Sequence, residues 1–103
     1  MTSPEQGSEL AALGERSWQM SRRLGAMSLE HRFMALAEEV GELGRSLLGR
    51  AGVKSCSDDE PLDVSFAGVL FELLVLAREC NVDIVVGYEN GLQLLAERHG
   101  SSD

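Results

Sequence analysis

The chain has 103 residues, of which 44% are apolar and 25% charged, a composition typical of one globular domain rather than of a disordered chain. Its formal charge of −8 argues against a protein that binds nucleic-acid polymers, because neutralising their phosphates requires a basic surface. The longest apolar run, residues 62–77, is shorter than the roughly 20 residues of a membrane-spanning helix and contains two acidic residues, so no membrane association is expected.

The two ends of the chain are predicted to lie outside the fold. Residues 1–7 are small and polar, and we expect them to be disordered, like the tail 100–103. Residues 8–99 are predicted to form a single helical domain. Cys56 and Cys80 lack the spacing of a metal site, and no apolar signal sequence precedes the domain, so we expect free thiols and a cytoplasmic location. A disulfide would require the fold to bring the two cysteines together.

The first predicted helix begins at Ser8 and ends at Gly25, a residue type that commonly terminates helices. Its apolar positions keep helical spacing, and Trp18 lies beside them. Two roles are open for Trp18, which are packing in a core or interface and stacking against a nucleobase. The apolar positions are Leu10, Leu13, Met20 and Leu24.

The second predicted helix begins at Ser28, a good N-cap residue, and ends near residues 49–52. Its apolar residues recur at alternating steps of four and three, which places them on one narrow stripe of the helix. We interpret this stripe as a core seam. It consists of Leu29, Phe33, Leu36, Val40, Leu43 and Leu47.

Three carboxylates share the other side of this helix. Glu38, Glu39 and Glu42 fall within an arc of roughly 100°, where like charges repel one another. One possibility is that water screens this charge and that Arg45, one turn further on, partly balances it. The other is that a divalent cation neutralises it, because hard cations such as Mg²⁺ prefer oxygen ligands. Arg45 also has two open roles, which are balancing the negative end of the helix dipole and binding a phosphate.

The third predicted helix follows a polar loop over residues 53–60 and spans about residues 62–80, with Pro61 at its start. It is apolar on nearly every side and must be covered on all faces. Three other short helices provide too little material, so we expect the chain to form a homodimer or a dimer of dimers. The last helix is predicted over Ile84–Arg98, capped by Asp83. Residues 83–88 also suit a strand, but the chain offers no second strand to pair with it.

A family resemblance rests on the run from Leu36 to Leu43, which reads Leu-Ala-Glu-Glu-Val-Gly-Glu-Leu. This run resembles the first metal-binding motif, Glu-Glu-x-x-Glu, of the MazG-like all-α nucleoside triphosphate pyrophosphohydrolases, and the resemblance extends from about Trp18 to Arg98. It implies a four-helix bundle completed by oligomerisation. It also implies hydrolysis of a nucleoside triphosphate to the monophosphate and pyrophosphate, with Mg²⁺ or Mn²⁺ as the cofactor. Glu38, Glu39 and Glu42 would then be metal ligands or bases.

The second motif of that family, Glu-x-x-Asp, is replaced here. Ser65 stands in the place of the glutamate and Gly68 in the place of the aspartate, so two anionic ligands are missing. Glu72 projects in the same arc, one turn beyond Gly68, and a carboxylate in so apolar a helix needs a partner. That partner is a metal shared with the second helix, or else Arg22, Arg23 or a capping backbone group.

Three functions follow as hypotheses. The first is a pyrophosphohydrolase with an atypical, weakened metal site, in which Glu38 and Glu39 are catalytic and Glu38, Glu39, Glu42 and Glu72 bind metal. The second is a catalytically inactive member of the same fold with a binding or regulatory role. The third is an unrelated helical dimerisation module. The candidates for substrate binding are Trp18, Arg45 and Arg98, of which Arg98 matches an arginine of the family's last helix.

Overall fold

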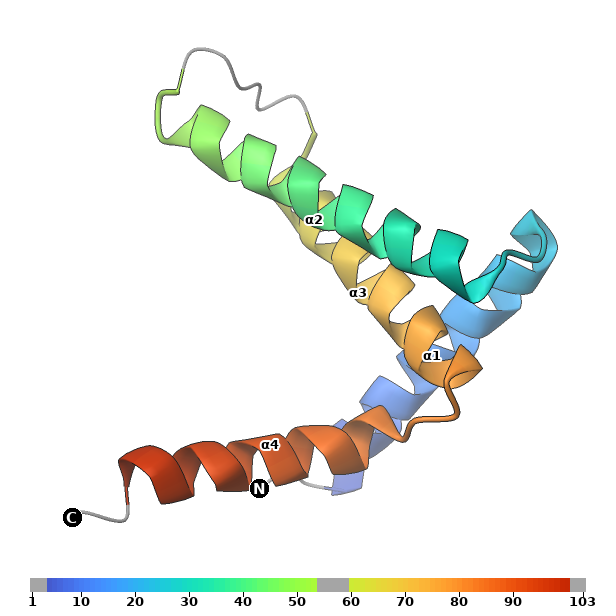
Figure 1. Ribbon diagram of the computed structural model, residues 1–103, viewed down its shortest axis with the longest axis vertical. Helices are drawn as coiled ribbons and strands as arrows, with labels where there is room; N and C mark the ends of the chain where they lie inside the picture. The colour runs from blue at the N-terminus through green and yellow to red at the C-terminus, as the bar shows by residue number, and fades with distance from the viewer. Residues whose placement is uncertain (1–3, 54–59, 101–103) are drawn as a thin grey trace.

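The computed structural model describes residues 4–53 and 60–100, with side chains from residue 9 onward. The described residues form four α-helices and no strand, which confirms the all-α prediction (Figure 1). The segment 84–88, for which a strand was the alternative, is helical. The helices are α1 (Pro4–Leu24), α2 (Leu29–Arg50), α3 (Leu62–Glu79) and α4 (Ile84–His99).

The starts of two helices follow from their capping residues, as predicted. The Ser28 hydroxyl oxygen accepts a hydrogen bond from the backbone N–H of His31 over 3.1 Å and caps α2. Asp83 caps α4 in the same way, with its carboxylate accepting from the N–H groups of Val85 and Val86. Each cap satisfies backbone donors that have no partner within the helix.

The start of α1 differs from the prediction. The helix begins at Pro4 rather than at Ser8, so it includes part of the segment expected to be disordered. A proline is compatible with the first turn, because its fixed φ angle is close to the helical value and the N–H that it lacks would have no helical partner. At the other end, Gly25 has a φ angle of +115°, which ends the helix as expected. Residues 1–3, residues 54–59 with Cys56, and residues 101–103 lie outside the described residues.

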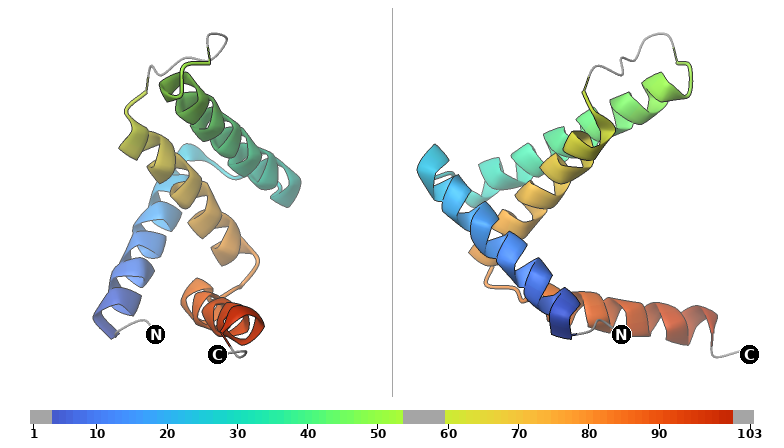
Figure 2. Two further views of the ribbon diagram at one scale, coloured as in Figure 1. Left: turned by 90° about the vertical axis from the view of Figure 1, so that its left-hand side faces the viewer. Right: turned by 180° about the vertical axis from the view of Figure 1, so that it is seen from behind.

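The central element of the fold is α3. It lies antiparallel beside α2 and is crossed on another side by α1, as the views of Figures 1 and 2 agree. Among the described residues, the buried apolar side chains are Leu74, Val75 and Ala77, and all three belong to α3. The core is therefore small and is built around the C-terminal half of one helix.

The stripe of α2 that was predicted to be a core seam is largely uncovered in the single chain. Phe33 is 60% exposed and Val40 51% exposed, while Leu36 and Leu43 are half-buried. The reason is that α2 packs against α3 along a neighbouring side of the helix, which carries Arg32 and other polar residues. Within one chain, the core-seam interpretation is therefore wrong for the exposed residues of the stripe, whereas Leu36 and Leu43 are half-buried.

The chain as a whole is open. The helix α4 leads away from the α2–α3 pair and packs near α1 only at its beginning (Figures 1 and 2). The radius of gyration is 16.3 Å, against about 13 Å for a compact domain of 100 residues. None of the helices in the described part of the chain is both long enough and apolar enough to cross a membrane.

Candidate functional site

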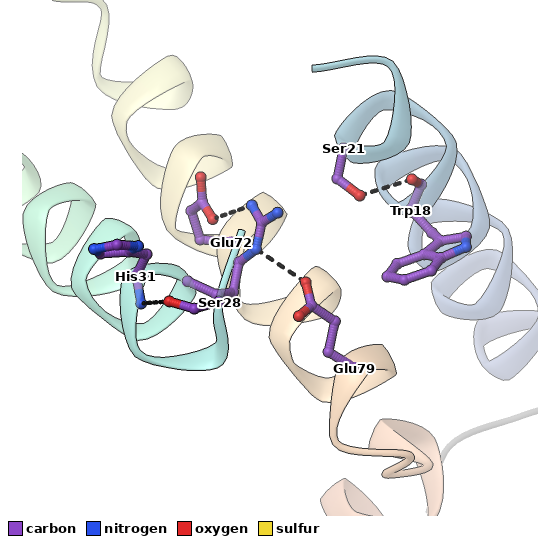
Figure 3. A network of polar contacts seen from close by, with 7 residues as sticks. Trp18, Ser21, Ser28, His31, Glu72 and Glu79 are labelled. Atoms are coloured by element: carbon purple, nitrogen blue, oxygen red, sulfur yellow. Dashed lines mark hydrogen bonds and ion pairs between the residues drawn. The ribbon is translucent and has the colours of Figure 1, made fainter. Parts of the chain in front are cut away.

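A buried arginine links α2 to α3. The Nη1 atom of Arg32 lies 3.2 Å from a carboxylate oxygen of Glu72, and its Nε atom donates to Glu79 over 3.1 Å. Arg32 is only 4% exposed, and Figure 3 shows the carboxylates of Glu72 and Glu79, two turns apart on α3, directed at one guanidinium. The partner of Glu72 is therefore Arg32, and not the Arg22 or Arg23 that the sequence suggested.

Glu39 of the first motif and Gly68, at a position of the second motif, lie in contact in the structure. The carboxylate of Glu39 lies directly against Gly68, and a Cβ atom added to this glycine would lie 2.9 Å from Cδ of Glu39. Arg32 and Glu39 are seven residues apart and lie on the same side of α2. The antiparallel pairing of the two helices therefore brings Glu39 to the place where the family's second motif would be.

Further carboxylates surround this point. The hydroxyl group of Ser65, buried on α3, donates a hydrogen bond to Glu60 over 2.8 Å. The pKa of Glu39 is raised, first by burial of its carboxyl and then by the negative charges of Glu42, Glu60 and Glu72. Glu39 is therefore close enough to each of these three glutamates to be repelled by it, although Glu72 is also held by Arg32.

Glu38 is directed elsewhere, and Glu42 lies between the two places, because its charge also raises the pKa of Glu39. Glu38 and Glu42 line an open depression together with Gly41 and Arg45. Glu38 and Arg45 are exposed on the side of α2 that does not pack on α3. This arrangement suits a solvated surface in which the positive charge of Arg45 offsets the nearby carboxylates.

The fit of a divalent metal can be judged from these positions. The donor atoms are carboxylate oxygens, as Mg²⁺ and Mn²⁺ prefer. Among the residues that the structure describes, however, no three acidic, histidine or cysteine side chains are grouped closely enough to hold a metal ion. Glu39 is pressed against Gly68, and Glu72 is bound to Arg32. The residues in their present positions do not fit a metal site.

A separate pocket, with a volume of about 370 Å³, lies where α1 ends and α2 begins. The guanidinium of Arg22 lies 5.8 Å from the centre of the Trp18 ring, and that of Arg78 lies 5.1 Å from it. Arg78 also donates to Glu15 over 2.9 Å, and this hydrogen bond lowers the pKa of Glu15. The pocket is lined by Trp18, Ser21, Arg22, Gly25, Ala26, Met27, Arg32 and Glu79.

This pocket has the size and chemistry of a small-ligand site. Small-molecule pockets begin at about 300 Å³ and combine apolar surface with a few directed polar groups. Here Met27 and the half-buried indole of Trp18 provide the apolar surface, and Arg22 provides an exposed positive charge. Both Trp18 and Glu79 line the pocket, and Figure 3 shows Trp18 on α1 and Glu79 on the neighbouring helix α3.

The predicted site residues therefore separate into three places. Glu39 and Glu72 lie in the α2–α3 seam, Glu38 and Arg45 lie on the outer surface of α2, and Trp18 lies in the pocket at the end of α1. Arg98 is in the last turn of α4, and this end of the helix points away from α2 and α3 (Figure 1).

Three residues of the seam were missed by sequence reasoning, namely Arg32, Glu60 and Glu79. One signal was available for two of them. Glu72 and Glu79 are seven residues apart on one side of α3, as Arg32 and Glu39 are on α2. A pair of polar stripes with this spacing indicates a polar helix–helix contact. Glu60 precedes its helix and has no such periodicity.

Comparison with known proteins adds no family assignment. No protein-family model, curated protein or solved structure matches the chain. The function must be argued from the chain's own residues, and the resemblance to MazG-like proteins stays a hypothesis.

Proposed function

We propose that this chain is a MazG-like protein that binds a nucleotide in the Trp18 pocket and has lost metal-dependent hydrolysis. The observation that carries the binding half of this proposal is the grouping of Trp18 with Arg22 and Arg32 around one pocket, with Arg22 beside the indole ring. An indole ring provides a surface on which any nucleobase can stack, worth about 1–3 kcal/mol per base. A guanidinium group provides the planar donors that phosphates prefer.

Arg22 places an exposed positive charge in this pocket, on a chain that is acidic as a whole. The formal charge is −8, so a phosphate is repelled from most of the surface. Within the pocket, the charge of Arg32 is balanced by Glu72 and Glu79, whereas Arg22 is exposed beside the indole ring. Arg22 is therefore the residue that we assign to the phosphate.

The loss of hydrolysis is supported by the state of the glutamates. Two of the family's five motif carboxylate positions are occupied by Ser65 and Gly68, and Glu39 fills the space beside this glycine. Glu72 is neutralised by a buried guanidinium instead of by a metal. Mg²⁺ dehydrates reluctantly, so a site with fewer anionic ligands offsets less of that cost.

Fluorescence titration tests the binding half, because Trp18 is the only tryptophan of the chain. Nucleoside tri- and monophosphates should change its emission with EDTA present as well as with Mg²⁺. Arg22→Gln should weaken binding about tenfold or more, the effect of losing one charge-assisted hydrogen bond. Arg45→Gln, which removes the charge beside Glu38, is the matched control and should bind like the parent. An emission that no nucleotide changes would refute the proposal.

A second candidate is a working pyrophosphohydrolase with a rearranged site. The raised pKa of Glu39 favours it, because crowded carboxylates are what a divalent cation relieves. Release of pyrophosphate from nucleoside triphosphates is the measurement, with Mg²⁺ or Mn²⁺. Release that depends on metal and disappears in Glu39→Gln, but not in Glu30→Gln, would replace the first proposal by this one.

A further inference from the structure

Glu79 places a carboxylate in the wall of the Trp18 pocket. Its Oε1 atom accepts a hydrogen bond from Nε of Arg32 over 3.1 Å, and its side chain is 20% exposed, whereas that of Arg32 is 5% exposed. An ionised carboxylate has about four acceptor sites on its two oxygens and no donor. Arg32 therefore holds Glu79 in position, and the carboxylate can still accept hydrogen bonds from a ligand.

The charges at this pocket balance one another. Arg22, Arg32 and Glu79 line it, and Glu72 is bonded to Arg32, so two cations stand against two carboxylates. Both carboxylates bond to Arg32, and Arg22 is the cation that we assign to the phosphate of a ligand. A phosphate monoester carries about −1.5 to −2 near pH 7. One phosphate group suits this site better than three, because the second and third would add negative charge beside Glu79 without a further cation from the pocket.

The dimensions of the pocket also suit a small nucleotide. Its volume of about 370 Å³ is near the lower end of the roughly 300–1,000 Å³ of small-molecule sites. Trp18 and Arg22 are four residues apart, which is about 6 Å along the axis of α1. A base on the indole ring and a 5′-phosphate on Arg22 would span this turn through one ribose. The guanidinium of Arg22 lies 5.8 Å from the ring centre, close to the roughly 6 Å limit of a cation–π contact, so little is lost when it turns to a phosphate.

A fixed carboxylate distinguishes the bases by their hydrogen-bonding edges. Guanine presents two neighbouring donors on its Watson–Crick edge, N1–H and the N2 amino group, and the two oxygens of a carboxylate can accept both. Adenine and cytosine present an amino donor beside a ring nitrogen whose lone pair repels a carboxylate. Uracil presents one N–H between two carbonyl oxygens. Glu79 therefore favours guanine over the other three bases.

We propose that the ligand of the Trp18 pocket is a guanine nucleoside monophosphate, whose base donates to Glu79 and whose phosphate accepts from Arg22. This inference rests on the proposed nucleotide binding and adds which nucleotide is bound. Its base stacks on Trp18 between these two groups. Stacking alone accepts any base, so the selectivity comes from Glu79.

Calorimetric titration of the full chain with EDTA present tests the choice of nucleotide. GMP should bind about tenfold or more tightly than AMP, because hydrogen bonds to a charged acceptor are lost with adenine. IMP keeps N1–H and lacks the N2 amino group, so its affinity should lie between the two. GTP should bind several-fold more weakly than GMP. Equal affinities for GMP and AMP, or a GTP affinity above that of GMP, would overturn this inference and leave nucleotide binding itself intact. A chain that binds none of the four nucleotides refutes both proposals.

Two variants with the same chemical change isolate the role of Glu79. Glu79→Gln and Glu72→Gln each remove one carboxylate from Arg32, but Glu79 lines the pocket and Glu72 does not. An amide offers one donor and one acceptor, so Glu79→Gln should lower the ratio of GMP to AMP affinity to about one or less. Glu72→Gln should keep the ratio of the parent. Both affinities are measured on the same variant, so a partial loss of folding leaves the ratio unchanged. A Glu79→Gln variant that keeps the guanine preference overturns the inference.

Discussion

Arg32 determines how α2 and α3 fit together at the level of single residues. Its guanidinium bonds to two carboxylates one heptad apart on α3, so a shift of one turn between the helices would leave a buried charge without its partner. Every buried polar side-chain atom in the described residues has a hydrogen-bond partner. The polar seam is thus satisfied internally, and it fixes the register that places Glu39 against Gly68.

Removing the charge of Arg32 should destabilise the fold strongly. Arg32→Met leaves Glu72 and Glu79 without their cation in a largely buried seam, and losing one partner of a buried ion pair costs about 3–5 kcal/mol. Urea unfolding measures the loss. Arg78→Met, which breaks an exposed pair with Glu15, should change the unfolding midpoint little. Equal losses for the two variants would show that the Arg32 pairs contribute no more than surface contacts.

The pH dependence of stability should reveal the raised pKa of Glu39. Its pKa is raised in the folded protein, so the folded state gains stability from this carboxyl below the ordinary pKa of 4.5 and loses it as the pH rises through the raised value. Glu39→Gln should therefore stabilise the protein at pH 7 by a few tenths of a kcal/mol, the scale of like-charge repulsion on a helix. The gain should disappear below about pH 4.

Melting curves of parent and variant at both pH values make this comparison. A gain of equal size at pH 7 and pH 4 would show that something other than ionisation is responsible. A large loss at pH 7 would mean that Glu39 is a structural partner of a cation.

At the level of helices, the sequence predicted which helices form and where α2 and α4 begin better than it predicted how the helices pack against one another. Ser28 and Asp83 act locally, through backbone groups within one turn, and so the starts of α2 and α4 could be predicted from neighbouring residues alone. The side of α2 that packs on α3 could not be predicted in this way. Two stripes of α2 were candidates, and α2 packs with the polar stripe that contains Arg32 because carboxylates on α3 complement its charge. This complementarity depends on both helices and not on α2 alone.

Restoring the missing carboxylates tests whether the α2–α3 pair is a degenerate metal site. Ser65→Glu with Gly68→Asp places two acids beside Glu39, Glu42 and Glu60, so it should tighten Mg²⁺ and Mn²⁺ binding and, without metal, destabilise the fold by about 1–3 kcal/mol through crowding. Calorimetric titration and melting curves measure the two effects.

The control is the amide pair Ser65→Gln with Gly68→Asn, which has the same shape without the charges. The stability that the amide pair loses measures the steric cost of the larger side chains. The difference in stability between the acidic pair and the amide pair measures the cost of charge repulsion. If the acidic pair binds metal no more tightly than the amide pair, the two motif positions do not form a metal site, and the enzymatic candidate is refuted with it.

At the level of the whole molecule, the single chain buries only a small part of its apolar surface. In the part of the chain that the structure describes, the buried apolar residues Leu74, Val75 and Ala77 come from one helix, while apolar side chains along α2 and α4 remain exposed. The sequence did indicate that α3 needs more cover than one chain offers. It could not show that the uncovered surface is shared with α2, because that depends on the angle at which two helices pack.

Thermal stability should therefore depend on protein concentration. If two chains fold as one unit, unfolding releases two molecules, and each tenfold dilution lowers the stability of the dimer by about 1.4 kcal/mol. For a cooperative unit of two 103-residue chains this lowers Tm by about 3–5 °C per tenfold dilution. Circular dichroism melts over a hundredfold range of concentration measure the slope. A Val40→Glu variant that folds should melt at a lower temperature that dilution does not change. A parent Tm independent of concentration would mean that the small core built on α3 holds one chain together by itself, and that association through the exposed apolar side chains of α2 contributes nothing to folding.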